Sequence, residues 1–146
     1  MQRRTLIRYA TGSLLISLLP LRLTAAARQT LEQVYGNAEL STGRVHLKLP
    51  ALAENGSSVP LTVSVDSPMT EADHVTEIRL FAEKNPVPEL ARYRLFPASG
   101  KAAISTRIRL SDTQIITAVA RMQDDSVWVA RGKIVVTLAA CVEPLL

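Results

Sequence analysis

The feature that most constrains the fold is an alternation of apolar and polar residues that recurs at intervals of about ten residues. It is clearest in segments 45–49 and 61–65. Successive side chains of a β-strand point to opposite faces, so this alternation is typical of half-buried strands. Five further segments have the composition of strands, namely 75–83, 91–96, 103–110, 113–121 and 127–138. The sequence therefore predicts about seven strands.

Turn-forming residues separate these segments. Gly, Pro, Asn, Asp and Ser gather in 54–58, 66–68, 85–88, 97–100 and 123–126, and such clusters favour tight connections. Short strands with regular turns and no alternating helices are typical of an all-β, immunoglobulin-like antiparallel β-sandwich. The chain of 146 residues has the size of one domain with one core.

One helix is expected ahead of the strands. Leu31, Val34 and Tyr35 recur at helical spacing, and Gly36-Asn37 is a stop signal. We therefore predict a short N-terminal helix within 24–37, after a signal peptide.

The segment 1–27 has the composition of an export signal. The basic pair Arg3-Arg4 comes first, an apolar run at 14–19 follows, and small residues at 25–27 close the segment. The apolar run is shorter than the ~18 residues that a membrane-spanning helix needs, so no membrane anchor is expected. The residues after Arg3-Arg4 favour a twin-arginine (Tat) signal peptide, with a general secretory signal as the alternative. We therefore predict a periplasmic location.

The formal charge of +4 does not indicate a nucleic-acid partner. Four of the 17 basic residues lie in the predicted signal peptide, which leaves 13 basic residues against 13 acidic ones; the four are Arg3, Arg4, Arg8 and Arg22. Binding to phosphate backbones depends on concentrated positive charge, so we expect no nucleic-acid partner.

Few residues could carry catalysis or bind a metal. The histidines are His46, on the polar face of a predicted strand, and His74, at a solvated strand start. No set of His, Cys, Asp and Glu has the spacing of metal ligands, and no nucleophile motif of a hydrolase is present. We interpret Asp124-Asp125 as a hairpin turn and Trp128 as part of a strand. The chain is therefore expected to hold no metal and no cofactor, and to have no enzymatic activity of its own.

Cys141 is the single cysteine, and it follows the last predicted strand. In an exported protein it cannot form an internal disulfide, so it is a reactive thiol, an intermolecular partner or an inert buried group. Residues 139–146 would project beyond the sandwich and offer the thiol to other proteins. The alternative is that Val142, Leu145 and Leu146 pack the cysteine down.

A series of motifs, in the same order along the chain, resembles the family of the Sox sulfur-carrier subunit Y (SoxY). The resemblance covers nearly all of 28–138, which we interpret as the folded domain. The motifs are Leu49-Pro50, Ala53-Glu54-Asn55-Gly56, Val59-Pro60, Val65-Asp66-Ser67-Pro68-Met69-Thr70, Phe81-Ala82-Glu83-Lys84-Asn85-Pro86, Pro97-Ala98-Ser99-Gly100, Ser105-Thr106-Arg107-Ile108-Arg109-Leu110 and Val135-Val136-Thr137.

This resemblance implies an immunoglobulin-like subunit that forms a heterodimer with a SoxZ-like subunit. It also implies that Cys141 covalently carries sulfur intermediates, such as a persulfide, during thiosulfate oxidation. Three periplasmic Sox enzymes would act on it: a cytochrome-type loading enzyme, a sulfate-releasing hydrolase and a sulfane dehydrogenase. Two alternatives remain. The chain could be a structural or binding homologue that pairs with SoxZ and carries no sulfur, or it could form a disulfide-linked dimer through Cys141.

The C-terminal arm, 139–146, departs from the family pattern. The family arm ends Gly-Gly-Cys-Gly-Gly, whereas this chain has Ala139, Ala140, Cys141, Val142 and Glu143. Alanine and β-branched valine restrict the backbone. The carboxylate of Glu143 disfavours the thiolate and repels an anionic thiosulfonate. We therefore expect a weaker or redirected carrier.

Overall fold

The computed structural model describes residues 31–36 and 38–139. The predicted signal peptide at 1–27, Asn37 and residues 140–146 lie outside the described residues. Within the described part, nine strands and one short α-helix are present. None of the helical segments described is long and apolar enough to cross a membrane.

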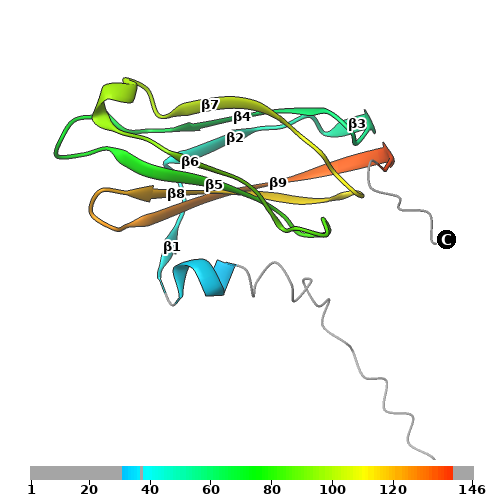
Figure 1. Ribbon diagram of the computed structural model, residues 1–146, viewed down its shortest axis with the longest axis horizontal. Helices are drawn as coiled ribbons and strands as arrows, with labels where there is room; N and C mark the ends of the chain where they lie inside the picture. Colours follow the sequence, from blue (N-terminus) through cyan, green and yellow to red (C-terminus); the bar gives the residue numbers. More distant parts are fainter. Residues whose placement is uncertain (1–30, 37, 140–146) are drawn as a thin grey trace, which may run out of the picture.

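The strands form two sheets that pack face to face (Figure 1). The larger sheet has the order β1-β9-β8-β5-β6, and β3 also pairs with β9, whereas the smaller sheet has the order β2-β4-β7. The structure confirms the all-β, immunoglobulin-like sandwich. The strands are β1 (Leu40–Ser41), β2 (Val45–Lys48), β3 (Leu52–Asn55), β4 (Val59–Val65), β5 (Val75–Ala82), β6 (Glu89–Arg94), β7 (Ala103–Ile108), β8 (Gln114–Met122) and β9 (Val127–Leu138).

All seven predicted strands are present, as β2 and β4 to β9. The additional strands β1 and β3 have two and four residues, and both run parallel to β9. They are too short to show a clear alternation, and Glu54-Asn55, predicted as a turn, forms the end of β3. The sandwich is therefore not purely antiparallel, because its last strand has two parallel neighbours.

Apolar side chains from both sheets fill the space between them. Val59, Leu61 and Val63 of β4 are at most 2 % exposed, and the residues between them are more accessible. Ile116 and Ile134 of the larger sheet are fully buried in the same cluster. The alternation that predicts the strands is therefore the alternation that builds the core.

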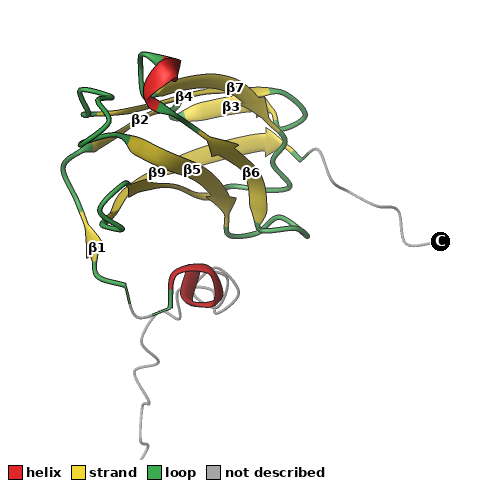
Figure 2. Ribbon diagram, turned by 60° about the vertical axis from the view of Figure 1, so that its left-hand side comes forward, coloured by secondary structure: helices red, strands yellow, loops and turns green. Residues whose placement is uncertain are grey.

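Part of the outer face of the larger sheet is buried as well. The helical residues 31–35 lie across this face (Figure 2). This second cluster explains why β8 is buried along almost its whole length, whereas β4 alternates. The buried members of the cluster are Tyr35, Phe81, Val119, Val127 and Val129, and Leu31, Val34 and Leu40 pack against them.

Tyr35 holds the helix on the sheet through its ring. The guanidinium groups of Arg79 and Arg121 lie 5.7 and 5.3 Å from the ring centroid, within the range of cation–π attraction. Burial raises the pKa of Tyr35 to about 12. The phenol therefore stays neutral at physiological pH, and the ring acts as an apolar and π-donating surface.

Glu77 of β5 is the buried acidic centre of the same face, at 6 % exposure. Its carboxylate accepts hydrogen bonds from Arg79 Nε and Arg92 Nε, both at 2.5 Å. Burial alone would raise the pKa of Glu77, but the hydrogen bonds and charges of the two arginines outweigh burial and hold the pKa below its usual value. Glu77 is therefore ionised and paired at neutral pH.

We expect Glu77→Gln to remove a contribution to stability that depends on pH. The pKa of Glu77 in the folded protein lies below the ordinary value of 4.5. The contribution is therefore fully present above that value and is lost as pH falls through the folded pKa. Urea unfolding at a series of pH values should show a less stable variant at neutral pH and a difference that shrinks in acid. Glu54→Gln, at an exposed carboxylate, is the control, and a difference that is constant with pH would contradict the prediction.

Candidate functional site

The residues that precede Cys141 form a tightly held end of β9, residues 134–138, which we call the arm base. Along one edge, β3 runs parallel to it, and the register pairs Asn55 with Leu138. The N–H of Gly56 donates to the carbonyl of Leu138 at 2.8 Å. The last strand is therefore hydrogen-bonded up to its final residue.

Two threonine hydroxyls hold the arm base in addition to the backbone ladder. The hydroxyl of Thr113 accepts a hydrogen bond from the N–H of Val136 at 2.9 Å. The hydroxyl of Thr137 donates to the carbonyl of Glu54 at 2.8 Å. Ile134, at the start of the arm base, is fully buried. Backbone, hydroxyl and apolar contacts thus fix the point from which the C-terminal arm leaves the sandwich.

An amide network of Gln114, Asn85 and Ser111 joins the loops beside the arm base. Gln114, 4 % exposed, accepts from the N–H of Lys84 at 2.8 Å and donates to Asn85 Oδ1 at 2.9 Å. Asn85 donates to the carbonyl of Arg109 at 2.7 Å and accepts from the N–H of Ser111 at 3.0 Å. The network therefore ties the β5–β6 turn to the β7–β8 connection.

A groove of about 550 Å³ opens between β6 and β7, the edge strands of the two sheets. Leu90 and Tyr93 contribute apolar surface to the groove. Asn85 of the amide network and Arg109, whose carbonyl accepts from Asn85, also line it. The N–H of Leu110, next to Arg109, donates to the carbonyl of Gly56 at 2.8 Å. Because Gly56 also bonds to Leu138, one end of the groove lies close to the arm base.

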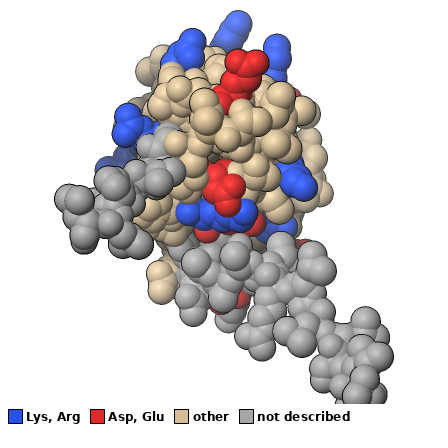
Figure 3. All heavy atoms as spheres, turned by 90° about the vertical axis from the view of Figure 1, so that its right-hand side faces the viewer, with Lys and Arg blue, Asp and Glu red and all other residues tan. Residues whose placement is uncertain are grey.

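The surface at this end of the sandwich carries charges of both signs. Figure 3 shows basic and acidic side chains interspersed among uncharged ones. Lys84 and Asp112 form an exposed ion pair at 2.9 Å. Hydrogen bonds from the Lys84 ammonium and the N–H of Thr113 lower the pKa of Asp112 below its usual value. Leu138, 65 % exposed, adds an apolar patch where the arm begins.

The histidines do not contribute to the arm base. His46 Nε2 contacts Asp66 at 2.7 Å. The carbonyl of His74 accepts from the N–H of Gln123, beside the β8–β9 turn. The 12 residues of β9 put that turn about 36 Å from Leu138, whereas three residues beyond Leu138 span about 10 Å. Cys141 therefore cannot form a catalytic pair with His74 in one chain.

The structure confirms the interpretation of two further segments. Asp124 and Asp125 form the β8–β9 turn, in which Asp125 has a φ of 63° and Ser126 donates to Asp124. Trp128 lies in β9. Within residues 31–36 and 38–139, no group of three or more His, Cys, Asp and Glu could hold a metal ion.

The predicted arm and signal residues lie almost entirely beyond the described part of the chain. Ala139 is described and exposed. The remaining predicted residues lie outside the described part of the chain, and they are Arg3, Arg4, Ala140, Cys141, Val142 and Glu143.

The model of one protein family, described as sulfur oxidation protein SoxY, matches residues 31–141. The matched stretch includes the helix, the nine described strands and, as its last residue, Cys141. The chain belongs to the SoxY family. Membership assigns this SoxY protein to sulfur oxidation as a carrier rather than a catalyst, and implies partners of the Sox system such as SoxZ. A search of the curated proteins finds no match.

The sandwich is similar to that of several solved structures. The sulfur carrier protein SoxY from Chlorobium limicola f thiosulfatophilum is 24% identical, with a TM-score of 0.64 over 77% of this chain and 97% of that chain. A superoxide reductase (neelaredoxin) from Ignicoccus hospitalis is 18% identical, with a TM-score of 0.59 over 66% and 94% of the chains. A putative superoxide reductase from Thermotoga maritima is 20% identical, with a TM-score of 0.55 over 67% and 87%. At these identities the similarity shows the fold alone.

The residues that hold the arm base are not evident from local sequence patterns. Thr113 and Gln114 act on groups more than twenty residues away in the chain, and periodicity does not report such contacts. The sequence does give one indication of this site, because Asn85 and Gly56 lie in motifs that resemble those of the SoxY family. The structure shows that both residues stabilise this end of the sandwich.

We expect Gln114→Leu to destabilise the amide network. The substitution leaves the partly buried N–H of Lys84 without its acceptor and removes one of the donors to Asn85 Oδ1, and an unsatisfied buried donor costs about 1–3 kcal/mol. Urea unfolding should show this loss, and hydrogen exchange should show faster exchange at Lys84 and Ser111. Gln123→Leu, in the exposed β8–β9 turn, is the matched control. Equal stability of the two variants would contradict a structural role for Gln114.

Proposed function

We propose that this SoxY protein is a periplasmic carrier that holds sulfur intermediates covalently on Cys141 during thiosulfate oxidation. The observation that carries the proposal is the place of the single cysteine, three residues beyond the arm base and at the end of the family match. A thiol on a short segment with a rigid base has a defined origin and a limited reach, about 10 Å from Leu138. Such a thiol suits delivery to several enzymes in turn.

Cysteine suits this role because its thiolate is a strong nucleophile that forms sulfur–sulfur bonds. In the loading step, the Cys141 thiolate and thiosulfate form an S–S bond and release two electrons. The product is an S-thiosulfonate, Cys–S–S–SO₃⁻. Water then cleaves the bond between the outer sulfur and the sulfonate group, which leaves a persulfide and releases sulfate and protons. The carrier needs no cofactor, since the bond forms on its own side chain.

The partners supply the catalysis. A cytochrome-type loading enzyme accepts the two electrons, a hydrolase releases sulfate, and a sulfane dehydrogenase oxidises the remaining sulfur. A SoxZ-like subunit completes the carrier as a heterodimer. Export by the signal peptide that carries Arg3 and Arg4 brings the chain to the compartment of these enzymes.

The arm of this chain makes it a slower or redirected carrier. Ala139, Ala140 and Val142 restrict backbone rotation at positions where the family has glycine. Glu143 places a carboxylate two residues from the thiolate, and like charges disfavour both the thiolate and an anionic adduct. The free-energy cost of entering a narrow enzyme channel is therefore higher for this arm than for a glycine arm.

The mature protein from the periplasm of cells grown on thiosulfate should carry sulfur-containing adducts on Cys141. Intact mass before and after reduction, with Cys141→Ser as control, measures them. We expect mass additions that reduction removes and that the serine variant lacks. An unmodified thiol under the same growth would favour a structural homologue that pairs with SoxZ. A reducible doubling of the chain mass would indicate the disulfide-linked dimer instead.

A glycine arm should load faster than the native one. We expect replacement of Ala139, Ala140, Val142 and Glu143 by glycine to raise the rate of thiosulfate loading several-fold in a purified SoxYZ pair. Intact mass against time, with the cytochrome-type enzyme present, gives the rate. Glu143→Gln alone separates the effect of charge from that of backbone stiffness. Native loading as fast as that of the glycine arm would show that the departure from the family pattern is neutral.

A further inference from the structure

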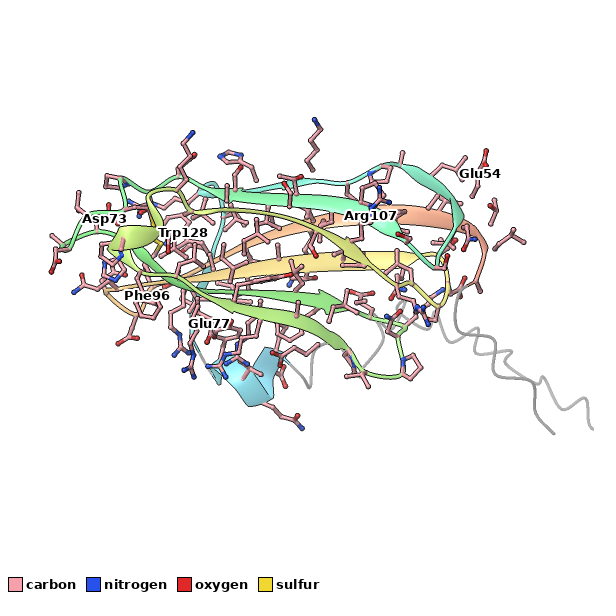
Figure 4. All side chains as sticks on the ribbon, turned by 45° about the horizontal axis from the view of Figure 1, so that its top comes forward. Glu54, Asp73, Glu77, Phe96, Arg107 and Trp128 are labelled. Atoms are coloured by element: carbon pink, nitrogen blue, oxygen red, sulfur yellow. The ribbon has the colours of Figure 1, made fainter. Side chains whose placement is uncertain are left out.

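The larger sheet carries a second polar site at the end that is remote from the arm base. A cleft of about 320 Å³ is lined on its polar side by His74, Arg94 and Arg121, which we call the cationic cleft. Phe96, 63 % exposed, forms an apolar part of its rim. Figure 4 shows Glu77 and Phe96 at this end of the sandwich, far from Glu54.

Strand register places two arginines on either side of Glu77. Glu77 of β5 is opposite Arg94 of β6 and opposite Arg121 of β8. Directly opposite residues on one face of a sheet have Cβ atoms about 5 Å apart. The three side chains therefore form one row across three strands.

The carboxylate of Glu77 does not neutralise the arginines of its own row. Both of its oxygens are occupied by Arg79 and Arg92, which form the next row along the strands. In the part of the chain that the structure describes, no hydrogen bond or ion pair involves the Arg94 side chain. Nε of Arg121 is buried without an acceptor. Both arginines line the same cleft, and each has donors without an acceptor among the described residues.

Two neighbouring contacts orient the lining of the cleft. The guanidinium of Arg121 lies 5.3 Å from the Tyr35 ring centroid, which restricts its position. Nδ1 of His74 lies 3.0 Å from the carbonyl oxygen of Thr70. Because a carbonyl oxygen only accepts hydrogen bonds, Nδ1 carries the hydrogen, and Nε2 is left for a ligand.

We propose that the cationic cleft binds a small tetrahedral dianion, sulfate or thiosulfate, without covalent attachment. Guanidinium groups donate paired hydrogen bonds to oxyanions, and sulfate and thiosulfate share the SO₃ group that such pairs recognise. Arg121 is opposite Val127, the first residue of β9, so the cleft lies about 36 Å from Leu138. The cleft is therefore separate from the attachment of sulfur to Cys141, and it adds a function to the one proposed above.

The test uses the mature chain with Cys141→Ser, so that no covalent adduct forms. Sodium sulfate and sodium thiosulfate are titrated separately into the ¹⁵N-labelled protein, with chloride holding ionic strength constant. We expect saturable shifts of the arginine Nε–H signals and of the amides of His74 and Thr76. Arg94→Gln should weaken binding at least about tenfold, the loss expected of one charge-assisted hydrogen-bond pair.

Arg109→Gln is the matched control, because it removes the same charge from an exposed side chain at the other end of the sandwich. It should leave the affinity unchanged. Equal affinity for the two anions, or tighter binding of one of them, supports the cleft and identifies its preferred ligand. Shifts that rise linearly without saturation would overturn the proposal, as would equal effects of Arg94→Gln and Arg109→Gln. Because Cys141 is absent from the test protein, this result does not depend on carrier activity.

Discussion

β9 is paired with other strands on two sides, and the geometry of the carrier end depends on this double pairing. β8 pairs with it on one side, and on the other side β1 pairs with its first two residues and β3 pairs with residues 135–138. A strand whose backbone donors and acceptors are satisfied on both sides resists slipping and fraying. The origin of the cysteine arm is therefore set by contacts that lie entirely outside the arm.

The two ends of the larger sheet have different electrostatic character. Near the arm base, opposite charges pair on the surface, as in Lys84 and Asp112. At the other end, burial of Glu77 requires compensation by Arg79 and Arg92, because an unpaired buried carboxylate is costly. Glu77 is the only carboxylate among the residues that line the cleft beside Arg94 and Arg121. Its oxygens bind Arg79 and Arg92, so it does not pair with Arg94 or Arg121. The lining of this cleft therefore has two guanidinium groups and one carboxylate, which is already paired with arginines outside the cleft.

The strands of the core could be predicted because their buried residues alternate, as in β4, and their turns contain Gly, Pro, Asn and Asp. β1 and β3 could not, since a strand of two to four residues leaves no periodic pattern. The helix could be predicted from the spacing of Leu31, Val34 and Tyr35, but its position could not. Only the tertiary structure shows that Tyr35 lies between Arg79 and Arg121. The same holds for the candidate site. Cys141 could be predicted because it is the single cysteine of the chain. The roles of Thr113 and Gln114 could not, because they depend on partners far away in the sequence.

The pairing of β1 with β9 also determines when the domain can be completed during its synthesis. Leu40 is opposite Val127, and Leu52 is opposite Val135. Strands near the start of the domain can therefore pair only after residues near its end have been synthesised. Contacts of such large sequence separation form slowly, because a long loop must close before the ladder can stabilise it. A nascent chain that lacks β9 has exposed edges on β1, β3 and β8. The native sheet can therefore close only after β9 has left the ribosome, and the same event that completes the fold forms the arm base.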